Sequence, residues 1–371
     1  MFTIGLLKEP SFESRVSLVP ETVAALVKKG VRVAVETGAG TNAFSSDEQY
    51  VQAGAEILSR SAVLQQAAVW LSIHSPEESA LDQGSGKVLI GVYQPLFNRE
   101  QMERWAQLGI TSFSLDMLPR TTRAQSMDVL SSQANIAGYK AVLLAASEYG
   151  RYFPMFMTAA GSIAPAKLLI LGAGVAGLQA IATARRLGAV VEVFDTRPAV
   201  KEEVMSLGAK FIEVEGAADA SQAGGYAVEQ SEAFKQRQKA RIAASAIKSD
   251  IIITTAQIPG KPAPLLLTEE MIGGMRPGSI IVDLAAATGG NTPYTKNNQV
   301  VEHGAVRIIG NSNLAASMPA DASKLYGKNM QNFLSLLIGA DGNLNLNWSD
   351  ELVSGSCITQ DGKLVHPRLT A

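Results

Sequence analysis

An apolar strand that runs into a glycine-rich turn and then into a helix is the feature that most restricts the fold of this chain. Residues 167–177 read KLLILGAGVAG, so Gly172, Gly174 and Gly177 have GxGxxG spacing. In such a pattern the first glycine permits a tight turn, the second lets the backbone approach a diphosphate, and the third lets the helix pack closely on the strand. The free N–H groups at the helix N-terminus bind the phosphates. The segment therefore predicts a dinucleotide site on a Rossmann fold.

The choice between NAD and NADP depends on the end of the next strand. We expect this strand over Val190–Phe194, and Asp195 follows it. A carboxylate there accepts hydrogen bonds from the adenosine ribose hydroxyls and repels a 2′-phosphate, whereas an arginine such as Arg197 accommodates that phosphate. Because the acid lies directly at the strand end, the sequence favours NAD.

The rest of the chain alternates strand-like and helix-like segments, which is typical of parallel sheets covered on both faces. We predict an α/β fold with two Rossmann-like, doubly wound parallel-sheet domains separated by a cleft. A helix over Ser132–Tyr149 connects them and a helix over Ala322–Leu337 returns the chain. The first domain then comprises residues 1–131 with 322–371, and the NAD(H)-binding domain comprises residues 132–321. The polar stretch Glu215–Ser231 is expected to be a surface loop.

Composition excludes several function classes. The 32 basic and 34 acidic residues give a net charge of −2 without a basic block, which argues against nucleic acid as a partner. One cysteine, Cys357, permits no internal disulfide and fits a reducing compartment. The three histidines lack metal-ligand spacing, so no metal is expected. The longest apolar run, 168–184, contains the glycine turn, and the N-terminus lacks the pattern of a signal peptide. We therefore expect a soluble chain.

Three segments resemble one family of enzymes, and the similarity extends over essentially the whole chain. The segments are Pro119–Tyr139, Met157–Lys167 and Val193–Glu202, together with the glycine turn. They are similar to the NAD(H)-binding component of proton-translocating nicotinamide nucleotide transhydrogenase. The family's signature loop over the nicotinamide is matched here by Arg120, Gln125, Asp128 and Ser131.

The resemblance implies a function and a set of partners. Hydride would pass directly between NAD(H), bound here, and NADP(H), bound by a partner domain. The family also implies a homodimer that docks on a membrane-spanning, proton-translocating subunit, which places the chain in the cytoplasm, peripheral to the inner (plasma) membrane. No side chain needs to exchange a proton in such a reaction, so the protein supplies orientation and electrostatics.

The expected catalytic residues are those of the signature loop. Gln125 and Ser131 would hydrogen-bond the nicotinamide carboxamide or ribose, Arg120 would hold the ring face, and Asp128 would fix the loop. Without the resemblance, an Arg120–Asp128 surface pair and helix capping by Gln125 and Ser131 explain the same residues. The expected cofactor-binding residues, Tyr226 as part of a closing loop among them, are Gly172, Gly174, Val175, Ala176, Gly177, Asp195, Thr196, Arg197, Tyr226, Gln257 and Asn311.

Two other function classes stay open at this point. Alanine dehydrogenase shares the fold, but its catalytic histidine falls near Gln94 and its second acid at Ala287, and neither side chain titrates. His74 lies near the position of that family's substrate-binding lysine and keeps this alternative open. Ala287 and Thr288 also depart from the transhydrogenase pattern. The third class is a non-catalytic, NAD-binding regulatory subunit.

Overall fold

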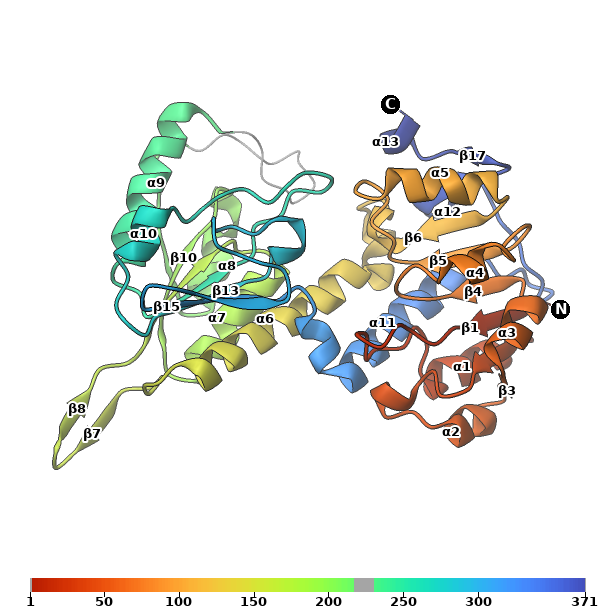
Figure 1. Cartoon of the computed structure of the whole chain (residues 1–371), viewed down its shortest axis with the longest axis horizontal. Helices are drawn as coiled ribbons and strands as arrows, with labels where there is room; N and C mark the ends of the chain where they lie inside the picture. The colour runs from red at the N-terminus through yellow and green to blue at the C-terminus, as the bar shows by residue number, and fades with distance from the viewer. Residues whose placement is uncertain (1, 217–229, 371) are drawn as a thin grey trace. The chain divides into compact units, whose positions relative to one another are not determined.

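The computed structural model describes residues 2–216 and 230–370, which form two compact units. Unit 1 comprises Met1–Gln133 and Ala316–Ala371, and unit 2 comprises Ala134–Ala315. Each unit is built on a largely parallel sheet with helices on both faces (Figure 1). In the described ranges, no helix has both the length and the apolar character needed to cross a bilayer.

Unit 1 contains an eight-stranded sheet in the order β17-β16-β6-β5-β4-β1-β2-β3. The six strands from β3 to β6 pair in parallel in the doubly wound order 3-2-1-4-5-6, and β16 and β17 add an antiparallel edge next to β6. The strands are β1 (Thr3–Leu6), β2 (Arg32–Glu36), β3 (Glu56–Leu58), β4 (Val69–Leu71), β5 (Val88–Gly91), β6 (Thr111–Ser114), β16 (Cys357–Gln360) and β17 (Lys363–Leu364). The helices are α1 (Pro20–Val27), α2 (Asp47–Gln52), α3 (Arg60–Gln66), α4 (Glu78–Leu81), α5 (Arg99–Gln107), α11 (Pro319–Leu334), α12 (Glu351–Ser356) and α13 (Pro367–Thr370).

Unit 2 repeats the same strand order in a seven-stranded sheet, β11-β10-β9-β12-β13-β15-β14, in which only β14 is antiparallel. The strands are β9 (Lys167–Leu171), β10 (Val190–Phe194), β11 (Lys210–Phe211), β12 (Ile251–Thr254), β13 (Ile280–Asp283), β14 (Gln299–His303) and β15 (Val306–Gly310). The helices are α6 (Val129–Glu148), which begins in unit 1, and α7 (Val175–Arg186), α8 (Lys201–Ser206), α9 (Glu232–Ala246) and α10 (Glu269–Gly273).

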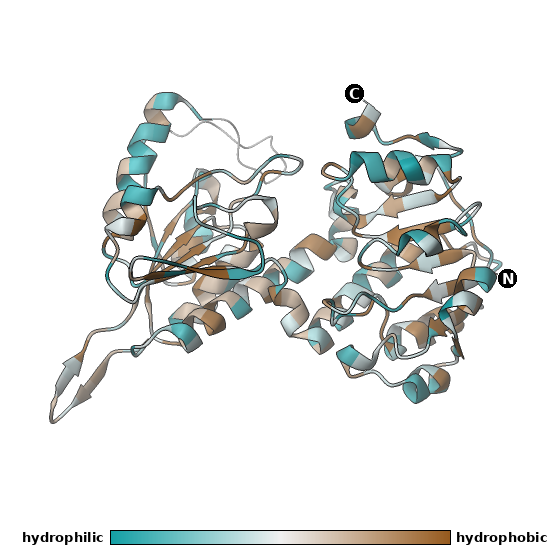
Figure 2. Ribbon diagram, viewed as in Figure 1, coloured by the Kyte–Doolittle hydropathy of each residue, from teal (hydrophilic) through white to brown (hydrophobic). Residues whose placement is uncertain are grey.

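The central strands are apolar without interruption because both faces of each sheet are buried. In β4, Val69 and Leu71 pack into one hydrophobic cluster and Trp70 packs into the cluster on the opposite face. In β12, Ile252 likewise faces away from Ile251 and Ile253. Figure 2 shows the strands as the hydrophobic centre of each unit and α5 as a largely hydrophilic helix. The predicted α/β class with two Rossmann-like parallel sheets is therefore confirmed.

Local predictions differ from the structure in two places. Helix α6 begins at Val129 rather than at Ser132, because the carboxylate of Asp128 accepts a hydrogen bond from the N–H of Ser131 (2.9 Å) and caps the helix earlier. The stretch expected to be an irregular break contains a hairpin of β7 (Phe156–Thr158) and β8 (Gly161–Ile163), which extends away from the seven-stranded sheet (Figure 1).

A close helix contact in unit 2 gives a first testable prediction. A Cβ atom on Gly138 of α6 would lie 2.1 Å from the carbonyl oxygen of Ala176 in α7. Gly138→Ala forces the helices apart, and we expect urea unfolding to show a loss of about 1–3 kcal/mol. Gly273→Ala is the control, because a Cβ there has no atom within 4 Å. Equal midpoints for the two variants would contradict this packing argument.

Candidate functional site

The carboxyl ends of the unit 2 strands meet at one edge of the sheet. Leu171 at the end of β9 is in register with Phe194 of β10 and with Thr254 of β12. The residues that follow these strands therefore lie side by side. Because β10 and β12 flank β9 and the chain leaves β9 in a different direction on each side, this edge is the switch point where doubly wound sheets bind ligands.

The three glycines of the turn after β9 have different structural reasons. Gly172 has φ +107°, a conformation that favours glycine. A Cβ on Gly177 would lie 1.9 Å from the carbonyl oxygen of Gly172, so only glycine lets α7 approach β9. Gly174 precedes α7 with φ −77° and ψ −170°, and a Cβ there has no protein atom within 4 Å. The fold needs Gly172 and Gly177, whereas the space beside Gly174 is left open for a ligand.

Asp195 connects this turn to the second strand. Its Oδ2 accepts hydrogen bonds from the N–H of Ala173 (2.7 Å) and from Nη2 of Arg197 (2.7 Å). Its Oδ1 accepts from the N–H and Nε of Arg197 at 2.8 and 2.9 Å. The side-chain hydrogen bond with Asp195 raises the pKa of Arg197 above its ordinary value. The predicted acid thus lies beside the glycine turn, paired with the predicted arginine.

Two further residues support the turn, and the sequence interpretation did not include them. The hydroxyl of Thr255 donates to the carbonyl oxygen of Gly172 at 3.1 Å. The fully buried Asn291 donates through Nδ2 to the carbonyl oxygens of Ala256 (2.9 Å) and Pro264 (2.8 Å). Thr255 follows the buried strand β12 directly, a signal that places it at this edge. Asn291 has no comparable signal in the sequence.

The other predicted cofactor-binding residues of unit 2 are spread along the same part of the unit. Val175 is exposed in the first turn of α7, where Ala176 follows, and Thr196 lies next to Asp195. Gln257 is exposed after β12 and donates to the carbonyl oxygen of Leu284 at 2.9 Å. Asn311 follows β15, and its Oδ1 accepts from the N–H of Asn313 at 2.8 Å, which is an Asx turn. Tyr226 lies outside the described residues.

The four predicted catalytic residues lie in one loop of unit 1. Arg120 and Gln125 are exposed, and a 3-10 turn covers Thr122–Met127. Asp128 accepts from both the N–H (2.9 Å) and the hydroxyl (2.6 Å) of Ser131, so these two residues form the N-terminal cap of α6. Helix α11 holds the loop, because Nδ2 of Asn329 and Nδ2 of Asn332 donate to the carbonyl oxygen of Ser126 at 2.8 and 2.9 Å.

A cluster of charged side chains occupies the carboxyl edge of the unit 1 sheet. Glu13 accepts from Nε (2.9 Å) and Nη2 (2.7 Å) of Arg15, and its Oε2 lies 2.7 Å from Nε2 of His74. Nη1 of Arg15 donates to Gln133 at 2.9 Å. Burial alone would raise the pKa of Glu13, but the bonds from Arg15 and His74 lower it to about 2.

Glu9 belongs to the same cluster and has the opposite shift. Its carboxylate oxygens accept from the N–H groups of Ile73 (2.5 Å) and His74 (3.1 Å), directly after β4. Burial outweighs these hydrogen bonds and raises the pKa of Glu9 to about 7.

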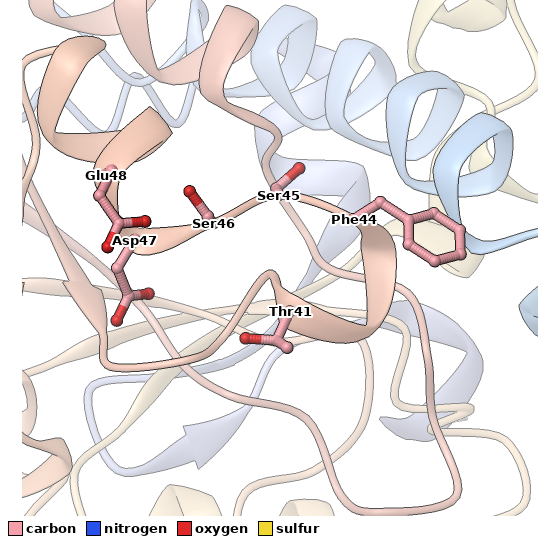
Figure 3. Close-up of a pocket in the computed structure, with 6 residues that line it drawn as sticks. All are labelled: Thr41, Phe44, Ser45, Ser46, Asp47 and Glu48. Atoms are coloured by element: carbon pink, nitrogen blue, oxygen red, sulfur yellow. The ribbon is translucent and has the colours of Figure 1, made fainter.

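Other features of the described residues offer no alternative centre. Residues 2–216 and 230–370 contain no group of three His, Cys, Asp or Glu side chains that could hold a metal ion. A hollow of about 430 Å³ lies at the start of α2, where the Phe44 ring points away from the carboxylates of Asp47 and Glu48 (Figure 3). Asp47 already accepts from the N–H of Gly38 (2.9 Å), and Ser46 caps α2. These polar groups serve the local fold.

Comparison with known proteins agrees with this geometry. The N-terminal domain of the family "Alanine dehydrogenase/PNT" matches residues 5–137, and its C-terminal domain matches residues 141–367. The first of the chains that make up the NAD(P) transhydrogenase alpha subunit of Rhodospirillum rubrum is 48% identical, over 96% of each chain. A crystal structure of transhydrogenase from Sinorhizobium meliloti superimposes with a TM-score of 0.89 at 45% identity, covering 98% of this chain and 100% of that one. An L-alanine dehydrogenase structure superimposes with a TM-score of 0.82 at 25% identity, covering 99% and 98%.

The glycine turn gives a second prediction, in which two similar substitutions act differently. Gly174→Ala adds a methyl group to open space, so we expect unfolding midpoints within about 0.5 kcal/mol of the wild type but about tenfold weaker NADH binding. Gly177→Ala collides with the Gly172 carbonyl, and we expect it to cost about 1–3 kcal/mol of stability. Urea unfolding and NADH fluorescence titration check both. Unchanged NADH affinity in a folded Gly174→Ala variant would remove this glycine from the site.

The raised pKa of Glu9 gives a pH prediction. The folded protein binds a proton at Glu9 more tightly than the unfolded chain does, so this group stabilises the fold at low pH, and its contribution falls as pH rises from about 4.5 to about 7. The neighbouring charges of Glu13, Arg15 and His74 contribute their own pH dependence, which Glu9→Gln retains. We expect wild type to lose up to about 3 kcal/mol relative to Glu9→Gln across this interval in urea unfolding.

Glu100→Gln on the exposed side of α5 is the control for this experiment. Its stability difference from wild type should not follow that of Glu9→Gln. Parallel stability curves for wild type and Glu9→Gln would mean that Glu9 titrates alike in the folded and unfolded chains.

Proposed function

The chain belongs to the alanine dehydrogenase/PNT family of oxidoreductases, and we propose that it is the NAD(H)-binding component of a proton-translocating NAD(P) transhydrogenase. The observation that carries the proposal is the switch-point edge of unit 2. There the open side of Gly174, the N-terminus of α7 and the Asp195 carboxylate line up as a site for a diphosphate and an adenosine ribose.

The proposed reaction is direct hydride transfer to or from NADP(H) on a partner domain. The nicotinamide ring supplies the hydride chemistry, and the chain binds and orients the dinucleotide. Gly172, Gly174, Val175, Ala176 and Gly177 would hold the diphosphate. Asp195, Thr196 and Arg197 would serve the adenosine ribose, and Tyr226, Gln257 and Asn311 would complete the pocket.

The signature loop would serve the nicotinamide end. Arg120 and Gln125 are exposed, which leaves them accessible to a ligand. Asp128 and Ser131 bond to each other, which supports a role in fixing the loop, and the oxygen of the Ser131 hydroxyl retains acceptor capacity. The two asparagines of α11 keep the loop in place through Ser126, as a preorganised site requires.

The charged cluster of unit 1 supports transhydrogenation over amino-acid oxidation. An amino-acid substrate needs a cationic group for its carboxylate, and Arg15 already has a bidentate carboxylate partner in Glu13. His74 is paired with the same glutamate. Gln94 and Ala287 do not titrate, so neither supplies the proton acceptor that deamination requires.

We further propose that the chain works as a homodimer docked on a membrane-spanning subunit, at the cytoplasmic face of the plasma membrane. The hairpin of β7 and β8 supports self-association, because its apolar side chains are exposed: Met155 by 63%, Met157 by 75% and Ile163 by 45%. Exposed apolar patches of this kind mark protein contacts.

Hydride transfer gives the third kind of test. The chain is mixed with NADH, an NADP analogue with a distinct absorbance and a purified NADP-binding transhydrogenase domain, and we expect analogue reduction. Arg120→Ala should lower turnover about 10–100-fold while NADH affinity changes by less than about threefold, because Arg120 is assigned to ring orientation. Arg99→Ala, in an exposed pair with Glu103, is the control.

The competing functions give different results in the same cuvette. NAD reduction that depends on alanine and needs no partner domain would overturn the proposal in favour of an amino-acid dehydrogenase. NADH binding with neither reaction would indicate a regulatory subunit. Unchanged turnover of Arg120→Ala would remove Arg120 from its assigned role.

A further inference from the structure

The carboxylate proposed to bind the adenosine ribose is saturated by the chain's own donors. A carboxylate has about four lone-pair positions. At Asp195 four donors fill them: the N–H of Ala173, and the N–H, Nε and Nη2 of Arg197, all between 2.7 and 2.9 Å. The residue is 9% exposed, so these donors take the place of water. A ribose hydroxyl reaches Asp195 only if one of the four gives way.

The four donors are not equally movable. The N–H of Ala173 belongs to the glycine turn, and the N–H of Arg197 belongs to the turn that leaves β10. The other two belong to the Arg197 guanidinium, whose side chain is 18% exposed and can swing outward about its own torsions. The guanidinium is therefore the group that a ribose displaces.

We propose that Arg197 is a specificity-determining residue of the dinucleotide site: paired with Asp195 it occupies the place of the ribose hydroxyls, and released from Asp195 it binds a 2′-phosphate. The inference rests on the proposed NAD(H) site and deepens it. A guanidinium matches phosphate geometry with two parallel hydrogen bonds. The pairing with Asp195 uses this same capacity internally. NADH is thus preferred because the acid holds the arginine as well as because it repels a phosphate.

The first test removes the arginine. In Arg197→Gln, ribose hydroxyls no longer compete with a charged bidentate partner, so we expect the Kd for NADH to fall about threefold to tenfold. The Kd for NADPH should stay high, because Asp195 remains. Arg276→Gln is the matched control, since Arg276 also pairs with an aspartate, Asp250, at the opposite edge of the same sheet. A tenfold weaker NADH complex in Arg197→Gln alone would overturn the inference, because Arg197 would then hold the ligand rather than compete with it.

The second test releases the arginine without removing it. Asp195→Asn has the same size and keeps an oxygen that accepts the N–H of Ala173, but its neutral amide no longer binds the guanidinium. We expect the ratio of Kd for NADPH to Kd for NADH to fall about 100-fold, and Asp195→Asn/Arg197→Gln to lose the gain in NADPH affinity. The same change should appear with 2′,5′-ADP compared with ADP, which isolates the adenosine half.

The outcomes separate this inference from the proposed function. Wild type that binds no NADH overturns both. Wild type that binds NADH while Asp195→Asn gains no affinity for NADPH or 2′,5′-ADP, in a variant whose thermal unfolding matches wild type, overturns only the role of Arg197. A gain that persists in the double variant also overturns it, because another group would then bind the phosphate.

Discussion

The close approach of Gly177 to the carbonyl of Gly172 is the contact on which the geometry of unit 2 depends. It draws the first turn of α7 onto the end of β9, so that free N–H groups face the carboxyl edge of the sheet. The N–H of Ala173 reaches Asp195 only in that position. Gly138 extends the arrangement, because α6 packs against the same turn of α7 at Ala176. One helix terminus is thus fixed from below, from the side and through the neighbouring strand.

Both units have the strand order 3-2-1-4-5-6, yet their switch points are filled differently. In unit 2 the edge carries small residues and one acid, which leaves space beside Gly174. In unit 1 the corresponding edge carries Glu9, Glu13 and His74, which bond to one another and to the backbone. The topology creates a ligand-binding edge in each unit, and side chains decide whether that edge stays open.

Much of this organisation could be predicted because it is encoded locally. The alternation of apolar strands and helices predicts the α/β class, and the spacing of Gly172, Gly174 and Gly177 with Asp195 predicts the edge that carries the site. The bonds of Thr255 to the glycine turn and of Asn291 to Pro264 could not be predicted, since each joins segments that only the folded sheet brings together. The start of α6 was predicted too late because the capping residue was an aspartate read as a ligand-loop residue. The residues of the signature loop stay a prediction for function.

The antiparallel edge of the first sheet has a consequence for synthesis on the ribosome. Strand β6 receives its neighbour only from Cys357–Gln360, and the hydroxyls of Ser112 and Thr359 bond at 2.7 Å across that seam. The whole of unit 2 emerges between these two strands. The nascent chain therefore carries an unpaired strand edge while a complete second domain is translated, and edges of this kind are where chains associate wrongly. The later domain matures first, and the earlier one waits for its last strands.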